Sequence, residues 1–108
     1  MYLQLPLPLI PKKYKMPSPI LTAADNSVST ERQETYGHPY DNFEIIAKLW
    51  TTFKGIRFTE EDVSMMMILT KVARLKNTPK HIDSLIDIVG YVKCSELIMQ
   101  RKSELGIG

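Results

Sequence analysis

The sequence predicts an all-α protein, a small bundle of about four helices that follows a proline-rich extended arm. Three observations predict this class. Helix start and stop signals recur from Ser27 onward, apolar residues between them follow the helical period, and no useful stretch shows the alternation of a strand. With 108 residues, of which 44% are hydrophobic and 24% charged, the chain has the size and balance of one globular domain.

Residues 1–22 are expected to form the arm and residues 23–108 the helical domain, because five of the seven prolines lie within the first 19 residues. The apolar part of the arm is short and broken by prolines, and its lysines follow the apolar residues. It therefore predicts neither a membrane anchor nor an export signal, and we expect a cytoplasmic protein without a membrane partner. The arm is expected either to lie over its own domain or a neighbouring subunit, or to be disordered.

The first two helices are predicted from their boundaries. Ser27 or Ser29 can cap a short helix that Gly37 ends. The next helix should start at His38-Pro39, since proline is favoured at the first helical position, and Gly55 should close it.

The last two helices should form an antiparallel hairpin. Thr59 followed by three acidic residues is typical of a helix start, and this third helix should run to about Lys76. A tight turn at residues 77–79 should supply the next cap, and a long fourth helix should continue to about Lys102.

The segment HIDSLIDIVGYV, residues 81–92, is nearly all apolar but carries Asp83 and Asp87 four residues apart. Counting outward from the turn, Arg74 should face Asp83 and Lys71 should face Asp87. Two ion pairs that set the register of the hairpin would explain the four charges. Because burying ions costs several kcal/mol each, a bound polar ligand is the other explanation.

Other chemistry has little support in the sequence. The net charge of +2 does not predict a DNA or RNA partner, and no glycine-rich phosphate loop is present. Cys94 is the only cysteine and is expected to be an inert thiol. His38 and His81 lack the spacing of a transition-metal site.

Three segments, RQETYGHPYDNFEIIAKLW, DVSMMMILTKVARL and PKHIDSLIDIVGY, together resemble a group of small, largely uncharacterised phage and prophage proteins. The resemblance covers residues 32 to 91 and leaves the arm outside. Residue by residue, it carries over these polar positions: Arg32, Tyr36, Asn42, Asp62, Lys71, Arg74, Asp83, Asp87 and Tyr91.

The last segment is also similar to nucleotide-modification-associated phage domains and, more distantly, to the all-α NTP pyrophosphohydrolases of the MazG and dimeric dUTPase type. Those enzymes bind Mg²⁺ through E-x-x-E on one helix and E-x-x-D on the next. Here the corresponding patterns are D-x-x-E at Asp41 and Glu44, and D-x-x-x-D at Asp83 and Asp87. The resemblance thus implies a nucleotide ligand, whereas the irregular acids weaken the case for hydrolysis.

Three functions follow as expectations. The first is a phage nucleotide-binding protein that sequesters a nucleotide or a nucleotide-derived immune signal without hydrolysis or a cofactor. Its ligand-binding residues would be Arg32, Tyr36, Asn42, Lys71, Arg74, Asp83, Asp87 and Tyr91.

The second is a Mg²⁺-dependent NTP or dNTP pyrophosphohydrolase. Its metal ligands would be Asp41, Glu44, Asp62, Asp83 and Asp87. The third is a structural or adaptor protein in which the charges only set register. In the binding case the small core predicts a homo-oligomer with sites near the subunit contacts.

Overall fold

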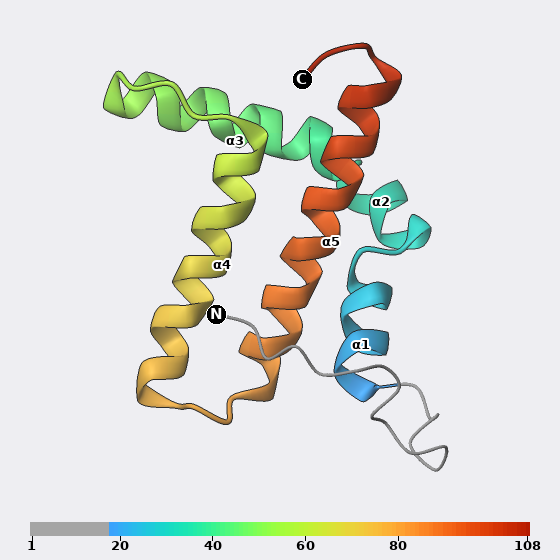
Figure 1. The fold of residues 1–108 in the computed structure, drawn as a ribbon, viewed down its shortest axis with the longest axis vertical. Coiled ribbons are helices and arrows are strands. Elements are labelled where there is room, and N and C mark those ends of the chain that lie inside the picture. Colours follow the sequence, from blue (N-terminus) through green and yellow to red (C-terminus); the bar gives the residue numbers. More distant parts are fainter. Residues whose placement is uncertain (1–17) are drawn as a thin grey trace, which may run out of the picture.

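The computed structural model describes residues 18–108, and within this range the chain is all-α, as predicted (Figure 1). It contains five helices and no strand in that range. The helices are α1 (Pro19–Ser27), α2 (Thr30–Tyr36), α3 (Pro39–Lys54), α4 (Glu60–Asn77) and α5 (Ile82–Glu104).

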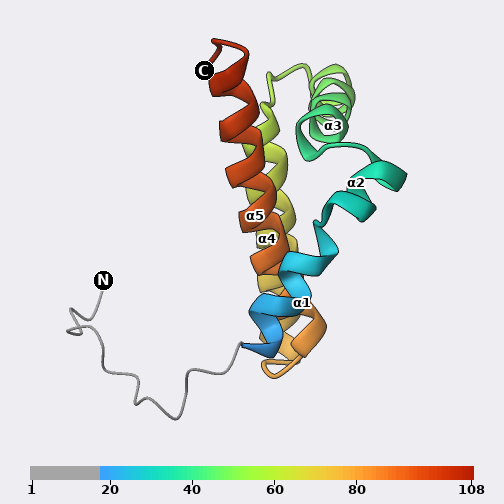
Figure 2. The same ribbon diagram turned by 90° about the vertical axis from the view of Figure 1, so that its right-hand side faces the viewer.

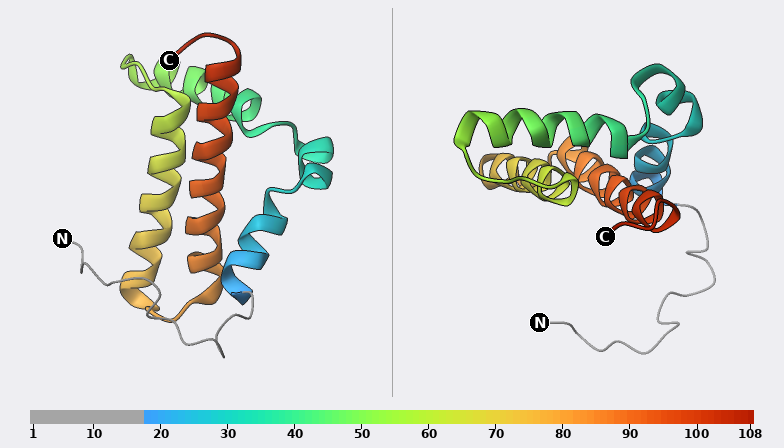
Figure 3. Two further views of the ribbon diagram at one scale, coloured as in Figure 1. Left: turned by 45° about the vertical axis from the view of Figure 1, so that its right-hand side comes forward. Right: turned by 90° about the horizontal axis from the view of Figure 1, so that it is seen from above.

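The helices lie in two layers. Figure 1 shows α4 and α5 side by side as one layer, and Figure 2 shows this layer edge-on, with α1, α2 and α3 toward one face of it. Helix α1 packs along the N-terminal half of α5, and α3 crosses the other end of the α4–α5 hairpin (Figure 3). Helix α2 therefore lies between two elements that are both fixed to α5.

The predicted boundaries of α2 and α3 are confirmed. The hydroxyl of Ser29 accepts from the backbone N–H of Arg32, and Gly37 follows the helix with a φ of 86°. Helix α3 starts at Pro39 after His38, and it ends at Gly55, whose φ of 71° lies in the left-handed region. Glycine adopts this conformation without the cost that a Cβ would add.

The start of α4 is also confirmed, and that of α5 needs a correction. Thr59 and Asp62 form a reciprocal capping box, in which each side chain accepts from the other residue's backbone N–H. Helix α5 begins at Ile82 with His81 as its N-cap, not at the Asn77-Thr78-Pro79 turn. The imidazole Nδ1 of His81 takes the capping role usually held by a serine or aspartate.

The extent of the N-terminal arm is a second correction. The arm is expected to reach residue 22, but residues 19–22 form the first turn of α1, the first of the five helices in the described range. Ser18 accepts from the backbone N–H of Leu21, and Pro19 occupies the first helical position. Pro19 thus starts a helix instead of prolonging the arm. The remainder of the arm, residues 1–17, lies outside the described residues.

The core is small and sits where α3 crosses the hairpin. Its buried members come from the α1–α2 junction, α3, α4 and α5: Val28, Tyr40, Phe43, Ala47, Val63, Cys94 and Ile98. One buried polar link also joins α4 to α5. The hydroxyl of Ser64 donates to the carbonyl of Tyr91 at 2.8 Å and lies 2.6 Å from the hydroxyl of Ser95.

None of the described helices combines the length and the apolar character that crossing a membrane would require.

Candidate functional site

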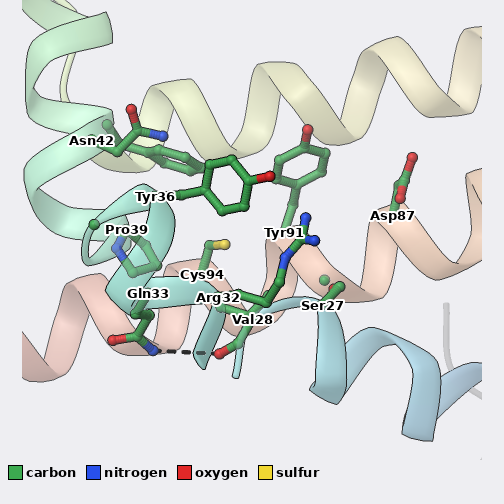
Figure 4. Close-up of a pocket in the computed structure, with 13 residues that line it drawn as sticks. Ser27, Val28, Arg32, Gln33, Tyr36, Pro39, Asn42, Asp87, Tyr91 and Cys94 are labelled. Carbon is green, nitrogen blue, oxygen red and sulfur yellow. Dashed lines mark hydrogen bonds between the residues drawn. The ribbon is translucent and has the colours of Figure 1, made fainter. Parts of the chain in front are cut away.

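A pocket of about 300 Å³ opens where α2 and the start of α3 face the middle of α5 (Figure 4). Five of the eight residues expected to bind ligand line it. They come from three helices: Arg32 and Tyr36 from α2, Asn42 from α3, and Asp87 and Tyr91 from α5. The structure thus brings together residues that are up to 59 positions apart in the sequence, counted from Arg32 to Tyr91.

The predicted contact of Lys71 with Asp87 is confirmed. The Lys71 ammonium lies 3.0 Å from a carboxylate oxygen of Asp87, across the α4–α5 hairpin. Lys71 does not itself line the pocket, but its partner does. Lys71 therefore affects the pocket indirectly, because its ammonium offsets the charge of the Asp87 carboxylate.

The second predicted contact, between Arg74 and Asp83, is wrong. No ion pair joins them within residues 18–108, both side chains are exposed, and neither lines the pocket. The physical reason is the rotation of α5 at this level. Ser84, the next residue, is 1% exposed and faces the interior, so Asp83 is turned to solvent in the first turn of the helix. A carboxylate is favourable there because of the helix dipole.

Arg32 is the cation of the pocket. Its guanidinium carbon lies 4.7 Å from the centre of the Tyr36 ring, and no carboxylate of the described chain lies within 4.0 Å of it. A guanidinium that is stacked on an aromatic face and has no carboxylate partner can bind an anion with two parallel hydrogen bonds. Arg32 is therefore the residue of the pocket best suited to a phosphate.

Tyr91 supplies an aromatic wall. Its ring lies 6.3 Å from that of Phe43, at 44° to it, and both rings line the pocket. Burial raises the pKa of the Tyr91 phenol, with the Lys71 ammonium opposing this shift and the Asp87 carboxylate adding to it. The phenol is thus a neutral hydrogen-bonding group at ordinary pH.

Gly90 and Gln33 also line the pocket and were not singled out from the sequence. A Cβ at Gly90 would lie 3.1 Å from the hydroxyl oxygen of Ser27, so this glycine lets the α1–α2 segment approach α5 closely. A glycine inside an apolar helix signals such an approach, because it costs about 1 kcal/mol relative to alanine and needs a packing reason. Gln33 donates to the carbonyl of Val28 at 3.4 Å, and no sequence signal marks it.

The acids expected to bind Mg²⁺ in the enzyme case do not converge. Among the described residues no three histidine, cysteine or acidic side chains are grouped for a metal. Asp41 pairs with Arg101 at 3.5 Å, Glu44 accepts from the Tyr40 hydroxyl at 3.2 Å, and Asp62 caps α4. Within residues 18–108 of one chain, the acids are therefore not placed to bind magnesium together.

Cys94 lies beneath the pocket, and its burial raises the pKa of the thiol to about 11. Because the thiolate is the reactive form, a buried thiol with a raised pKa is neutral and slow to react at pH 8. We expect a disulfide reagent such as DTNB to modify Cys94 at least tenfold more slowly in the native protein than in urea. Equal rates in the two states would contradict its burial.

Comparison with known proteins agrees with the phage resemblance. The family described as "Domain of unknown function (DUF6378)" matches residues 19–99, which include every candidate site residue. The chain is 41% identical over 86 residues to the "Gene 55 protein" of Mycobacterium phage L5. It is 39% identical over 89 residues to the "Gene 55 protein" of Mycobacterium phage D29.

These alignments cover 79% and 82% of the chain but only 55% and 59% of the two phage proteins. The chain thus spans somewhat more than half the length of these relatives. No solved structure matches it. The matches carry no statement about nucleotides, so the similarity to nucleotide-modification-associated and MazG-type domains stays a prediction.

Proposed function

We propose that this chain, which belongs to the family described as "Domain of unknown function (DUF6378)", binds a nucleotide or a nucleotide-derived molecule without hydrolysing it. The observation that carries the proposal is the convergence of five expected ligand residues on one pocket. A guanidinium, an amide, a carboxylate and two phenols are the groups with which proteins bind nucleotides.

The roles of the side chains follow from their chemistry. Arg32 takes the phosphate, and Tyr36 or Tyr91 stacks on the base. Asn42 and Asp87 make hydrogen bonds to polar atoms of the sugar or the base. Lys71 holds Asp87 in place through their 3.0 Å ion pair.

The dispersal of the acids favours binding over hydrolysis. A metal-dependent pyrophosphohydrolase needs carboxylates that converge on the phosphates. In this chain Asp41, Glu44 and Asp62 already serve an ion pair, a hydrogen bond and a helix cap. A phage protein with such a pocket would sequester its ligand, for example a nucleotide messenger of host immunity.

The test is recovery of the ligand. The protein is incubated with each common ribo- and deoxyribonucleotide and Mg²⁺, separated from free ligand, denatured by heat, and the released material is analysed by chromatography. We expect one nucleotide class to be retained and released intact. Release of pyrophosphate would support the enzyme alternative, and no retention of any nucleotide would leave the structural or adaptor role.

Self-association belongs to the same proposal. Figures 1 and 3 show the C-terminal end of α3 extending past α4. Ile45, Leu49 and Phe53 form an exposed stripe along this helix, four residues apart, and Phe53 is 85% exposed. An apolar stripe at this spacing is typical of a helix that packs on another helix, here one from a second copy. The N-terminal arm, which is predicted to lie over its own domain or a neighbouring subunit or to be disordered, falls outside the described residues up to residue 17.

Phe53→Asp is expected to shift the protein toward the monomer, because a carboxylate in an apolar helix contact has no partner. Sedimentation velocity at micromolar concentration measures the shift. Thr52→Asp introduces the same charge one residue earlier on an already exposed polar position, and it should leave the assembly unchanged. A wild-type protein that sediments as a monomer would contradict the self-association.

A further inference from the structure

The described lining of the pocket carries few charges, one of each sign. Of its described lining residues, Arg32 is the one cation and Asp87 the one anion. Lys71 does not line the pocket, but its ammonium lies 3.0 Å from the Asp87 carboxylate and offsets part of its charge. The Cys94 thiol, with a pKa of about 11, is neutral as well. The described lining thus offers one cation, Arg32, and one carboxylate, Asp87, whose charge Lys71 offsets in part.

This balance does not suit a long phosphate chain. Sites for di- and triphosphates gather several cations, a run of backbone N–H groups in a glycine-rich loop, or a metal held by acids. In the described part of the chain, acids are not grouped for a metal and no glycine-rich loop adjoins the pocket. A second or third phosphate would add negative charge near the Asp87 carboxylate and would find no second cation in the described lining.

The rest of the lining suits the remainder of a nucleotide. Pro39, Phe43 and the Tyr91 ring supply apolar surface for a base. The amide of Asn42 offers both a donor and an acceptor to a base edge. The volume of about 300 Å³ lies at the lower end of the range for small-molecule pockets.

We propose that the ligand of this pocket is a nucleoside with a single phosphate group, as a monoester or a cyclic diester, and that Asp87 excludes longer phosphate chains. The proposal rests on nucleotide binding as proposed above and adds the ligand class to it. Arg32 binds the one phosphate, and the negative charge of Asp87, the one carboxylate of the described lining, disfavours each further phosphate by like-charge repulsion.

Titration calorimetry of the full chain tests the ligand class. Nucleosides and their mono-, cyclic mono-, di- and triphosphates are compared, with and without Mg²⁺. The first phosphate should raise the affinity about ten- to a hundredfold, the range for a charge-assisted hydrogen bond. The second and third phosphates should lower the affinity.

Asp87→Asn should lower the ratio of the affinity for the monophosphate to that for the triphosphate. The substitution removes the negative charge and keeps the shape of the side chain. The matched control is Asp83→Asn, the same change four residues earlier, at an exposed position outside the pocket. Lys71→Met should raise the same affinity ratio, because the negative charge of Asp87 is then no longer offset. The opposite signs of the two variants separate this role from a general loss of fold, which melting curves monitor.

The results distinguish a failure of the single-phosphate class from a failure of nucleotide binding itself. A triphosphate that binds more tightly than the monophosphate, or a nucleoside that binds as tightly as it, overturns the single-phosphate class and leaves nucleotide binding standing. An unchanged preference in Asp87→Asn overturns the role of Asp87. If no nucleoside or nucleotide binds, the proposed function itself fails.

Discussion

Ile98→Ala is expected to destabilise the protein by about 2–5 kcal/mol, the usual cost of a large-to-small change in a core. Ile98 is 0% exposed and belongs to the cluster in which α3, α4 and α5 meet. The cluster has few buried members, so little neighbouring mass can relax into the cavity. For a domain of this size each 1 kcal/mol lowers the melting temperature by roughly 4–8 °C. Denaturant and thermal unfolding measure the effect.

The matched control is Met99→Ala, the next residue of α5. Its side chain is 59% exposed, and the change removes a similar volume of apolar atoms from the same helix. We expect its free energy of unfolding to stay within about 0.5 kcal/mol of the wild type, as for most surface changes. Similar losses in the two variants would mean that α5 is rotated from the position described.

The helix boundaries that the sequence predicted well are those with a complete local signal. Ser29 and Gly37 around α2, Gly55 after α3, and the Thr59 cap of α4 each act within one turn of helix. The backbone groups that they satisfy are left without a partner in any helix end, whatever the rest of the fold. Such signals can be recognised without knowledge of tertiary contacts.

At the two helix starts that were predicted wrongly, the local sequence is consistent with a helix start and with an extended or turn segment. Pro19 continues a run of prolines, but it is also favoured at the first position of a helix, and Ser18 before it is a good cap. Thr78-Pro79 has the same ambiguity, and there the helix starts later, at Ile82, with a histidine cap. What decides α1 is its packing along α5, which is a contact between distant segments.

The candidate site was predictable only in part for a related reason. The pairing of Lys71 with Asp87 follows from counting along a hairpin, and it is present. The same counting failed for Asp83, because a small rotation of the helix moves a side chain from the interior to solvent. That Arg32, Tyr36 and Asn42 share one pocket with Tyr91 depends on how α2 is held between α1 and α3. The resemblance assigned these residues to one ligand, but it could not show which of the eight share a pocket.

Arg32→Ala is expected to weaken nucleotide binding by about one to two decades, because a hydrogen bond to a charged group contributes roughly 1.5–3 kcal/mol. Arg32 lines the pocket, stacks on Tyr36 at 4.7 Å and is exposed, so its removal should leave the melting temperature almost unchanged. Titration of the nucleotide retained by the wild type, together with melting curves, separates a loss of binding from a loss of fold.

The controls use the other cations of the chain. Arg74→Ala removes the same side chain from an exposed helical position outside the pocket, and we expect it to leave the affinity unchanged. Arg32→Lys keeps the charge but loses the planar fork and its stacking on Tyr36, so its affinity should fall between those of Arg32→Ala and the wild type. If Arg74→Ala weakened binding as much as Arg32→Ala, the ligand would lie along the α4–α5 hairpin rather than in the pocket beneath α2. Arg74 would then bind the ligand on the hairpin face where the sequence analysis first placed a possible polar ligand.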